Sequence, residues 1–217
     1  MNRHLTLILD GIFGRPARCT RLRRRLECTC GPTEVFRYNS TGFVPFERLA
    51  ERLADRIRQM GQPVNLLGFS MGGIVIRTAH LLRPSLPIRR AVFLNSPHAG
   101  SRLAYVMPLA AGVRQLWPGS ALMKQLDQAD WAIPTLVTWC PFDAAIIPGH
   151  SANWPKATES IRCPFPLHTW VVGSPRIHQR IATFLGESED ERQRVNETAN
   201  TEYCPATMSN ARLTVQH

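Results

Sequence analysis

Residues 64–73 read VNLLGFSMGG, an apolar run that leads into a serine with a glycine two residues to either side. The run is typical of a buried β-strand, and the next apolar stretch, which ends at Leu82 before Pro84, predicts a helix. A serine on a sharp turn between strand and helix needs neighbours without side chains, and Gly68 and Gly72 meet that need. The turn lifts the Ser70 hydroxyl above the sheet, where the helix N-terminus adds positive potential.

The same alternation of strands and helices continues on both sides of this turn. Apolar runs predict further strands at residues 5–9, 34–38, 90–95, 134–140 and, shorter, 161–165. Helical periodicity predicts helices at residues 16–26, 46–60, 72–82 and 177–185. Strands that alternate with helices form parallel βαβ units. We therefore expect an α/β fold, an open and mostly parallel sheet of about six strands with helices on both faces.

Two segments depart from this alternation. Residues 99–131 are rich in Leu, Ala, Met and Trp and are interrupted by Pro and Gly, which predicts short helices inserted as a lid or cap. Residues 187–217 mix acids with Asn, Thr and Ser without sustained periodicity, and we expect a polar, flexible tail. Residues 1–186 are then one domain, a size that fits a chain of 217 residues.

Composition narrows the class of protein. With 44% hydrophobic and 19% charged residues the sequence is typical of a soluble globular protein. The net charge is +10, and residues 15–25 hold six arginines. Such a cluster could support weak association with an anionic membrane surface, although a solvated helix face is the simpler interpretation. We expect no nucleic-acid partner, because no nucleic-acid-binding motif accompanies the charge.

Location and bound groups follow from what the sequence lacks. The apolar run at residues 5–9 is too short for a signal peptide, and no apolar stretch approaches the about 18 residues of a membrane span, so we expect a cytoplasmic protein. The six cysteines form no CxxC pair and are expected to be reduced thiols. Cys28 and Cys30 alone fall short of a four-ligand zinc site, so we expect no metal. No dinucleotide fingerprint or P-loop predicts a cofactor.

The G-x-S-x-G motif in this context resembles the nucleophile elbow of the α/β-hydrolase superfamily, and the resemblance covers residues 4–186. The chain is most similar to small bacterial serine lipases and esterases. Residues 95–101, NSPHAGS, are similar to a segment of lipases and of phosphatidylinositol-deacylase-like hydrolases. The resemblance implies that Ser70 is the nucleophile of an acyl-transfer reaction.

A serine nucleophile needs a histidine base and an acid to orient it, and in this family the chain order is Ser, acid, His. Asp143 follows the strand at residues 134–140, at a position that resembles the family's acid loop. Asp127 and Asp130 fall in the inserted segment and are expected to be surface charges or helix caps. We therefore predict Asp143 as the acid.

Four histidines follow Asp143 in the sequence, namely His150, His168, His178 and His217. His168 stands between the last short strand and the closing helix, where the family has its base. His150 is too close to Asp143 in the chain, and His178 is expected to face outward from its helix. His98 precedes the acid and is expected to order its own loop.

The oxyanion of the reaction needs two backbone donors. The resemblance implies the N–H of Met71, directly after the nucleophile, and the N–H of Ile12, in the loop after the first strand. Lipases commonly have His-Gly where this sequence has Asp10-Gly11. Because of this departure, the sequence alone does not determine how the loop is hydrogen-bonded.

These residues predict a serine carboxylic-ester hydrolase, a lipase or esterase, that acts on a small-molecule or lipid ester through an acyl-enzyme. Apolar side chains of the inserted segment are expected to favour a hydrophobic acyl chain; they are Tyr105, Val106, Met107, Leu109, Leu116, Trp117, Leu122 and Met123. Two alternatives stay open. One is an acyltransferase or thioesterase with the same triad, and the other is a non-catalytic protein of this fold that binds a ligand or partner.

Overall fold

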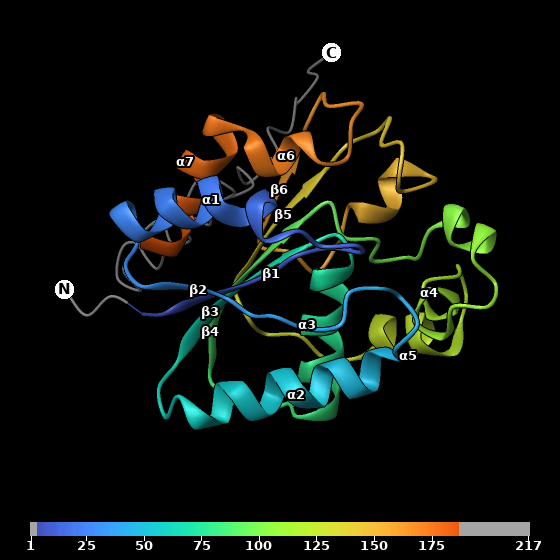
Figure 1. Cartoon of the computed structure of the whole chain (residues 1–217), viewed down its shortest axis with the longest axis horizontal. Coiled ribbons are helices and arrows are strands. Elements are labelled where there is room, and N and C mark those ends of the chain that lie inside the picture. The colour runs from blue at the N-terminus through green and yellow to red at the C-terminus, as the bar shows by residue number, and fades with distance from the viewer. Residues whose placement is uncertain (1–3, 187–217) are drawn as a thin grey trace, which may run out of the picture. The chain divides into compact units, whose positions relative to one another are not determined.

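A computed structural model describes residues 4–186, and its centre is one sheet of six strands (Figure 1). The strands are β1 (Thr6–Leu9), β2 (Thr33–Val35), β3 (Val64–Phe69), β4 (Ile88–Leu94), β5 (Thr135–Trp139) and β6 (Glu159–Arg162). Their order is β2-β1-β3-β4-β5-β6, and every neighbouring pair is parallel. The predicted α/β fold with an open parallel sheet is confirmed.

Helices cover both faces of the sheet. Figure 1 shows α1 (Pro16–Thr29), α6 (Trp170–Gly173) and α7 (Pro175–Gly186) on one face, and α2 (Phe46–Gln59) and α3 (Met71–Leu82) on the other. Each face has its own apolar cluster. Leu66 of β3 belongs to the cluster under α2 and α3, and Leu67 to the cluster under α1 and α7. This alternation explains why β3 is apolar along its whole length: both of its faces are covered.

Two strands differ in extent from the prediction. β2 ends at Val35, three residues early, because the chain then leaves the sheet and carries the Tyr38 hydroxyl to the carbonyl of Asp10, to which it donates a hydrogen bond. β6 begins at Glu159 and ends at Arg162, shortly before Pro164, which has no N–H to continue a ladder. Neither difference changes the order of the strands.

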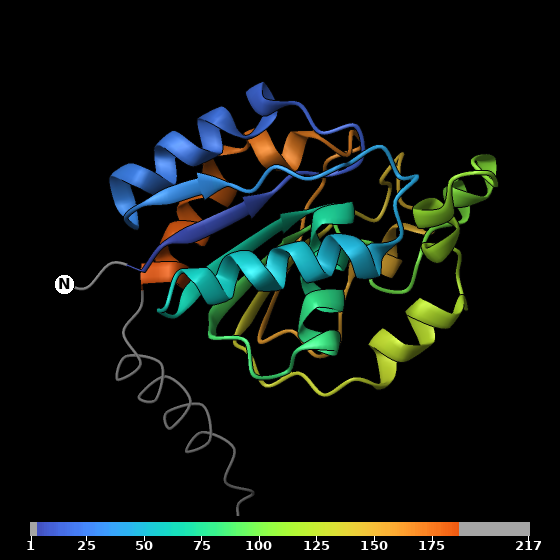
Figure 2. The ribbon, with the colours of Figure 1, turned by 60° about the horizontal axis from the view of Figure 1, so that its bottom comes forward.

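The inserted segment forms short helices, as predicted for it: η1 (Arg102–Val106), α4 (Ala111–Gln115) and α5 (Ala121–Gln128). A further short helix, η2 (Gly149–Ala152), follows β5. Figure 2 shows α4 and α5 at the end of the sheet toward which the strands run. In open parallel sheets ligands bind at that edge. That the inserted segment acts as a lid stays a prediction.

The chain divides into two units, Met1–Leu185 and Gly186–His217, and the sheet lies in the first. The tail predicted for residues 187–217 lies outside the described residues. Within residues 4–186, no helix has both the length and the apolar character that crossing a bilayer requires.

Candidate active site

Ser70 occupies the turn between β3 and α3 with φ of 52° and ψ of −120°. This is a backbone conformation that residues with side chains seldom adopt, and such strain gathers at functional sites. The Ser70 N–H donates to the carbonyl of Leu94 in β4 (2.8 Å) and ties the turn to the sheet. A Cβ on Gly68 would lie 2.4 Å from the nitrogen of Gly73, and one on Gly72 would lie 2.4 Å from the carbonyl oxygen of Leu9. The backbone around Ser70 therefore leaves no room for side chains at either glycine.

The acid and base predicted from the sequence lie together at the carboxyl edge of the sheet. His168 Nδ1 is 2.7 Å from Asp143 Oδ2, so the imidazole donates to the carboxylate. The His168 ring lies 4.8 Å from the ring of Phe69, the residue before Ser70. His168 Nε2 is buried and has no hydrogen-bond partner among residues 4–186. The structure thus gives His168 an oriented ring that contacts Phe69, the residue before the strained serine, and an Nε2 that forms no hydrogen bond to Ser70.

The Asp143 carboxylate is surrounded by donors. Its Oδ1 accepts from the N–H groups of Ala145 (2.8 Å) and Ile146 (3.1 Å), and its Oδ2 accepts from Asn95 Nδ2 (2.9 Å) as well as from His168. Burial raises the pKa of Asp143, but the hydrogen bond and charge of His168, the Ala145 N–H and the Asn95 amide outweigh it and lower the pKa below the ordinary value. The carboxylate therefore stays ionised when it orients the imidazole.

Asn95 supports the acid, a role that the sequence analysis did not identify. It directly follows β4 with a φ of 43°, a conformation that Asn tolerates better than most residues. Its Oδ1 accepts from Thr138 Oγ1 (3.0 Å), and its Nδ2 also donates to Cys140 Sγ (3.0 Å). Hydrogen bonds from Cys163 and Asn95 lower the pKa of the Cys140 thiol to about 7, although burial raises it. The sequence offered one indication of the role of Asn95: it is the last residue of the predicted strand at residues 90–95, at the carboxyl edge of the sheet.

Asp10 holds the loop that follows β1. Its Oδ1 accepts from the N–H of Gly11 (2.8 Å) and from Arg18 Nη1 (3.2 Å), and its Oδ2 accepts from the N–H of Arg15 (2.9 Å). A Cβ on Gly11 would lie 2.9 Å from the Cβ of Ser70, so the loop passes directly beside the serine. The acidic residue that departs from the usual lipase pattern is thus an anchor of this loop.

The two predicted oxyanion donors, Met71 and Ile12, directly follow Ser70 and Gly11 in the chain. Met71 is the first residue of α3, where N–H groups have no acceptor within the helix. Ile12 follows Gly11, and the next N–H, that of Phe13, donates to the carbonyl of Ser40 (2.8 Å). Their role as donors stays a prediction.

The remaining histidines have other surroundings. His178 is buried and its Nε2 donates to the carbonyl of Val172 (2.7 Å), so the prediction that it faces outward is wrong. The reason is that this side of α7 packs against α6. His98 is buried. Its Nδ1 lies 3.3 Å from Arg77 Nη1, and its ring stacks on that of Trp154 with 5.0 Å between the ring centroids. Burial, and then the charge of Arg77, keep the pKa of His98 well below its ordinary value.

Neither a metal nor a cofactor is suggested by the part of the chain that the structure describes. Within residues 4–186 no group of three or more His, Cys, Asp or Glu residues could hold a metal ion. Of the two cysteines considered for a zinc site, Cys28 is exposed and Cys30 is buried.

Large apolar side chains are exposed on the loops around the site. On the inserted segment these are Tyr105, Val106 and Leu109, the last 90% exposed. Phe142 and Leu167, the neighbours in sequence of Asp143 and His168, are 83% and 47% exposed. Single exposed apolar side chains are ordinary on a protein surface, whereas several that lie together mark a site for an apolar ligand or surface.

A six-stranded parallel sheet with a serine on the strained turn from β3 to α3 defines the class of α/β-hydrolases. A sequence model of the alpha/beta hydrolase family matches residues 14–213. The chain belongs to this family and is by that membership a hydrolase.

Solved structures with the same fold include lipases. A mature Bacillus licheniformis lipase, BlEst2, is 14% identical, with a TM-score of 0.71 over 85% of this chain and 93% of its own. A Paleococcus ferrophilus monoacylglycerol lipase is 15% identical, with a TM-score of 0.66 over 83% and 93%. The phospholipase PlaB of Legionella pneumophila, in complex with thio-NAD, is 14% identical, with a TM-score of 0.72 over 91% and 62%. At these identities the likeness shows the fold alone.

Proposed function

We propose that the chain is a serine carboxylic-ester hydrolase in which Ser70, His168 and Asp143 form the catalytic triad. The observation that carries the proposal is the hydrogen bond of 2.7 Å between His168 and Asp143, with the His168 ring 4.8 Å from that of Phe69, which precedes a serine at φ of 52°. The unengaged Nε2 of His168 is the atom that a general base requires.

The reaction then proceeds by two acyl transfers. Ser70 Oγ attacks the ester carbonyl as its proton passes to His168 Nε2, and Asp143 stabilises the imidazolium that forms. The N–H groups of Met71 and Ile12 receive the oxyanion of the tetrahedral intermediate. His168 returns the proton to the leaving alcohol, which leaves an acyl-Ser70. Water, activated by His168, then releases the carboxylic acid.

The exposed apolar side chains favour an ester with a hydrophobic acyl chain. Tyr105, Val106 and Leu109 lie on the segment inserted at the carboxyl edge, and Phe142 and Leu167 flank the acid and the base. Burial of apolar surface stabilises such an acyl chain in the site by about 25 cal/mol per Å². The names of the similar structures, a lipase and a monoacylglycerol lipase, agree with this substrate class.

A fluorophosphonate tests the proposal directly, because it reacts with an activated serine. We expect one adduct, located on Ser70 by peptide mass spectrometry, and no adduct in Ser70→Ala or in His168→Ala. His150→Ala is the matched control, since His150 lies outside the triad, and should label at the wild-type rate. A folded wild-type protein that stays unlabelled, or labelling that survives His168→Ala unchanged, would refute the proposed triad.

Turnover of a series of p-nitrophenyl esters then tests the substrate class. We expect kcat/KM to rise from acetate toward longer acyl chains, and Ser70→Ala to lower kcat by about 10⁶. A preference for acetate would contradict the hydrophobic acyl site. Product analysis in the presence of a second alcohol separates hydrolysis from acyl transfer, which uses the same residues.

A further inference from the structure

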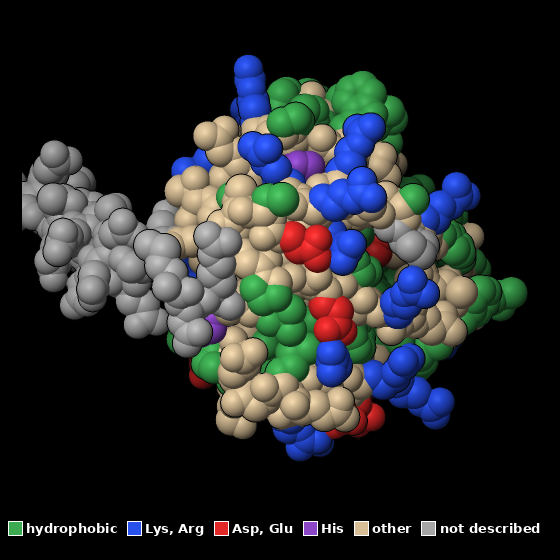
Figure 3. Space-filling view, turned by 60° about the vertical axis from the view of Figure 1, so that its left-hand side comes forward, with side chains coloured by type: hydrophobic (Ala, Val, Ile, Leu, Met, Phe, Trp, Pro, Cys, Tyr) green, Lys and Arg blue, Asp and Glu red, His purple; other side chains and the backbone are tan. Residues whose placement is uncertain are grey.

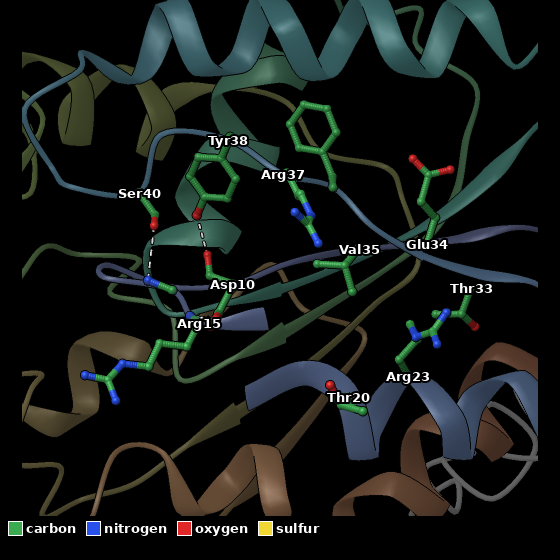
Figure 4. A pocket seen from close by; sticks show the side chains of 12 residues that line it. Asp10, Arg15, Thr20, Arg23, Thr33, Glu34, Val35, Arg37, Tyr38 and Ser40 are labelled. Atoms are coloured by element: carbon green, nitrogen blue, oxygen red, sulfur yellow. Dashed lines mark hydrogen bonds between the residues drawn. The ribbon is translucent and has the colours of Figure 1, made fainter. Parts of the chain in front are cut away.

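A cavity of about 540 Å³ lies at the free edge of the sheet, between α1 and the chain that runs from β2 to Ser40 (Figure 4). Ser70, Asp143 and His168 take no part in its lining. Asp10, which anchors the loop beside Ser70, is part of the lining, but the arginines of the lining lie outside the proposed catalytic machinery, so what the groove binds does not depend on the function proposed above. We call it the edge groove.

Positive charge faces the edge groove from two sides. Figure 4 shows Arg23 on α1 and Arg37 on the opposite wall directed toward the space between them. Within residues 4–186 the Arg37 guanidinium forms no ion pair or hydrogen bond, and Arg23 donates from one of its nitrogens, Nη1, to Glu27 Oε1 (2.9 Å). Arg15 extends from one end of the groove. Guanidinium groups in this arrangement still offer most of their donors.

The two acids of the lining are engaged elsewhere. Glu34 is turned away from the cavity and accepts two hydrogen bonds from Arg56, at 3.2 Å and 2.7 Å. Asp10 accepts from Arg18 and from two backbone N–H groups of its own loop. Neither carboxylate therefore neutralises the arginines that face the cavity.

The edge strand adds a backbone donor. The N–H of Phe36 donates to Ile8 of β1 (2.9 Å), and alternate peptide groups of a parallel strand face opposite sides. The N–H of Val35 therefore points away from β1, toward the free edge that the groove follows. A ligand with several acceptor oxygens can bond to this N–H and to both arginines.

Charge over one whole face of the protein is spread out. Figure 3 shows a face on which Lys and Arg side chains are spread out, with acidic side chains between them. General surface charge of this kind attracts anions weakly, and salt screens it. Two arginines that converge on a concave space can instead make charge-assisted hydrogen bonds to one group.

We propose that the edge groove binds a phosphate group, held between Arg23 and Arg37. A phosphate presents oxygens in several directions and matches guanidinium donors on opposite walls. The volume of the groove leaves room for the rest of a small phosphorylated molecule. A free phosphomonoester and the headgroup of an anionic phospholipid share this chemistry.

Calorimetric titration of the full chain with inorganic phosphate and with glycerol 3-phosphate, at an ionic strength fixed with chloride, tests the proposal. We expect saturable binding with a Kd of about 1 mM or tighter. The double variant Arg23→Ala, Arg37→Ala should weaken it at least about tenfold. The matched control Arg24→Ala, Arg25→Ala removes the same charge from exposed positions of α1 outside the groove, and should stay within about twofold.

Absence of saturable binding by the wild type would overturn the proposal, and so would equal weakening in both double variants, which is the result expected for diffuse surface charge. Circular dichroism verifies that each variant is folded. Sedimentation with phosphatidylglycerol vesicles identifies the source of the phosphate. Vesicle binding that glycerol 3-phosphate displaces, and that the groove variant lacks, indicates a lipid headgroup. Binding of glycerol 3-phosphate without vesicle binding indicates a soluble ligand.

Discussion

Replacement of Asp10 by asparagine keeps the size of the side chain but removes its charge and one acceptor oxygen. In the native protein the two carboxylate oxygens accept from the N–H groups of Gly11 and Arg15 and from the Arg18 side chain. A carboxamide has one acceptor oxygen, so at least one of the two backbone N–H groups loses its partner. A buried donor without an acceptor costs about 1–3 kcal/mol, and we expect Asp10→Asn to lower the free energy of unfolding by about that amount.

The same change should also affect catalysis, because the loop lies directly beside Ser70. A Cβ added to Gly11 would lie 2.9 Å from the Ser70 Cβ. If the loop supplies the Ile12 N–H to the oxyanion, loosening it removes part of one donor's contribution. Complete loss of such a donor lowers kcat about 10²–10³-fold. We therefore expect kcat of Asp10→Asn to fall between about tenfold and that limit, with little change in KM.

Steady-state hydrolysis of p-nitrophenyl butyrate and urea unfolding measure the two effects separately. Asp55→Asn is the matched control, because Asp55 is an exposed residue of α2 paired with Arg58, and should leave kcat unchanged. A lowered urea midpoint with unchanged kcat would refute the idea that this loop stabilises the oxyanion. An unchanged midpoint would refute the anchoring role of Asp10.

Three further predictions concern the acid, the turn and a buried base. Asp143→Asn should lower kcat by about 10⁴ in the same ester assay, as it removes the acceptor that fixes the imidazole; a loss below about tenfold would contradict the assignment. Gly72→Ala places a Cβ 2.4 Å from the carbonyl of Leu9 and should lower the free energy of unfolding by about 1–3 kcal/mol in urea, whereas Gly173→Ala, which meets nothing within 4 Å, should change it little. Burial, with the charge of Arg77, lowers the pKa of His98, so the unfolded chain binds this proton more readily and stability falls as the pH drops below about 6.5, by up to about 1.4 kcal/mol per pH unit. His98→Phe should remove that part of the slope between pH 7.5 and 5, and an unchanged slope would contradict it.

Features that depend on neighbours in the chain could be predicted from the sequence. The turn at Ser70 needs small residues two positions away, and Gly68 and Gly72 stand there. The parallel direction of the strands follows from their alternation with helices, because a βαβ unit joins parallel strands. The boundaries of β2 and β6 were less predictable, because they depend on where the chain must leave the sheet.

Features that depend on distant contacts could not be predicted in this way. Asn95 and Asp143 are 48 positions apart, and nothing local to either residue reports that the amide donates to the carboxylate. His178 stands on an amphipathic helix, but which side is buried depends on Val172 of α6. Asp10 departs from the pattern of lipases, and only the folded loop shows that its carboxylate accepts from two backbone N–H groups.

The contacts of Asp143 and His168 show which of the two residues holds the other in place. Three of its hydrogen bonds come from Ala145, Ile146 and Asn95, so the carboxylate would keep its place without His168. The imidazole, in contrast, has Asp143 as its hydrogen-bond partner and the ring of Phe69 as its aromatic contact. Asp143 therefore positions His168, and because Asn95 is bonded to β5 through Thr138, the sheet positions Asp143. In the proposed mechanism, the imidazole of His168 is thus oriented before an ester arrives, and the cost of ordering it is met by folding rather than by substrate binding.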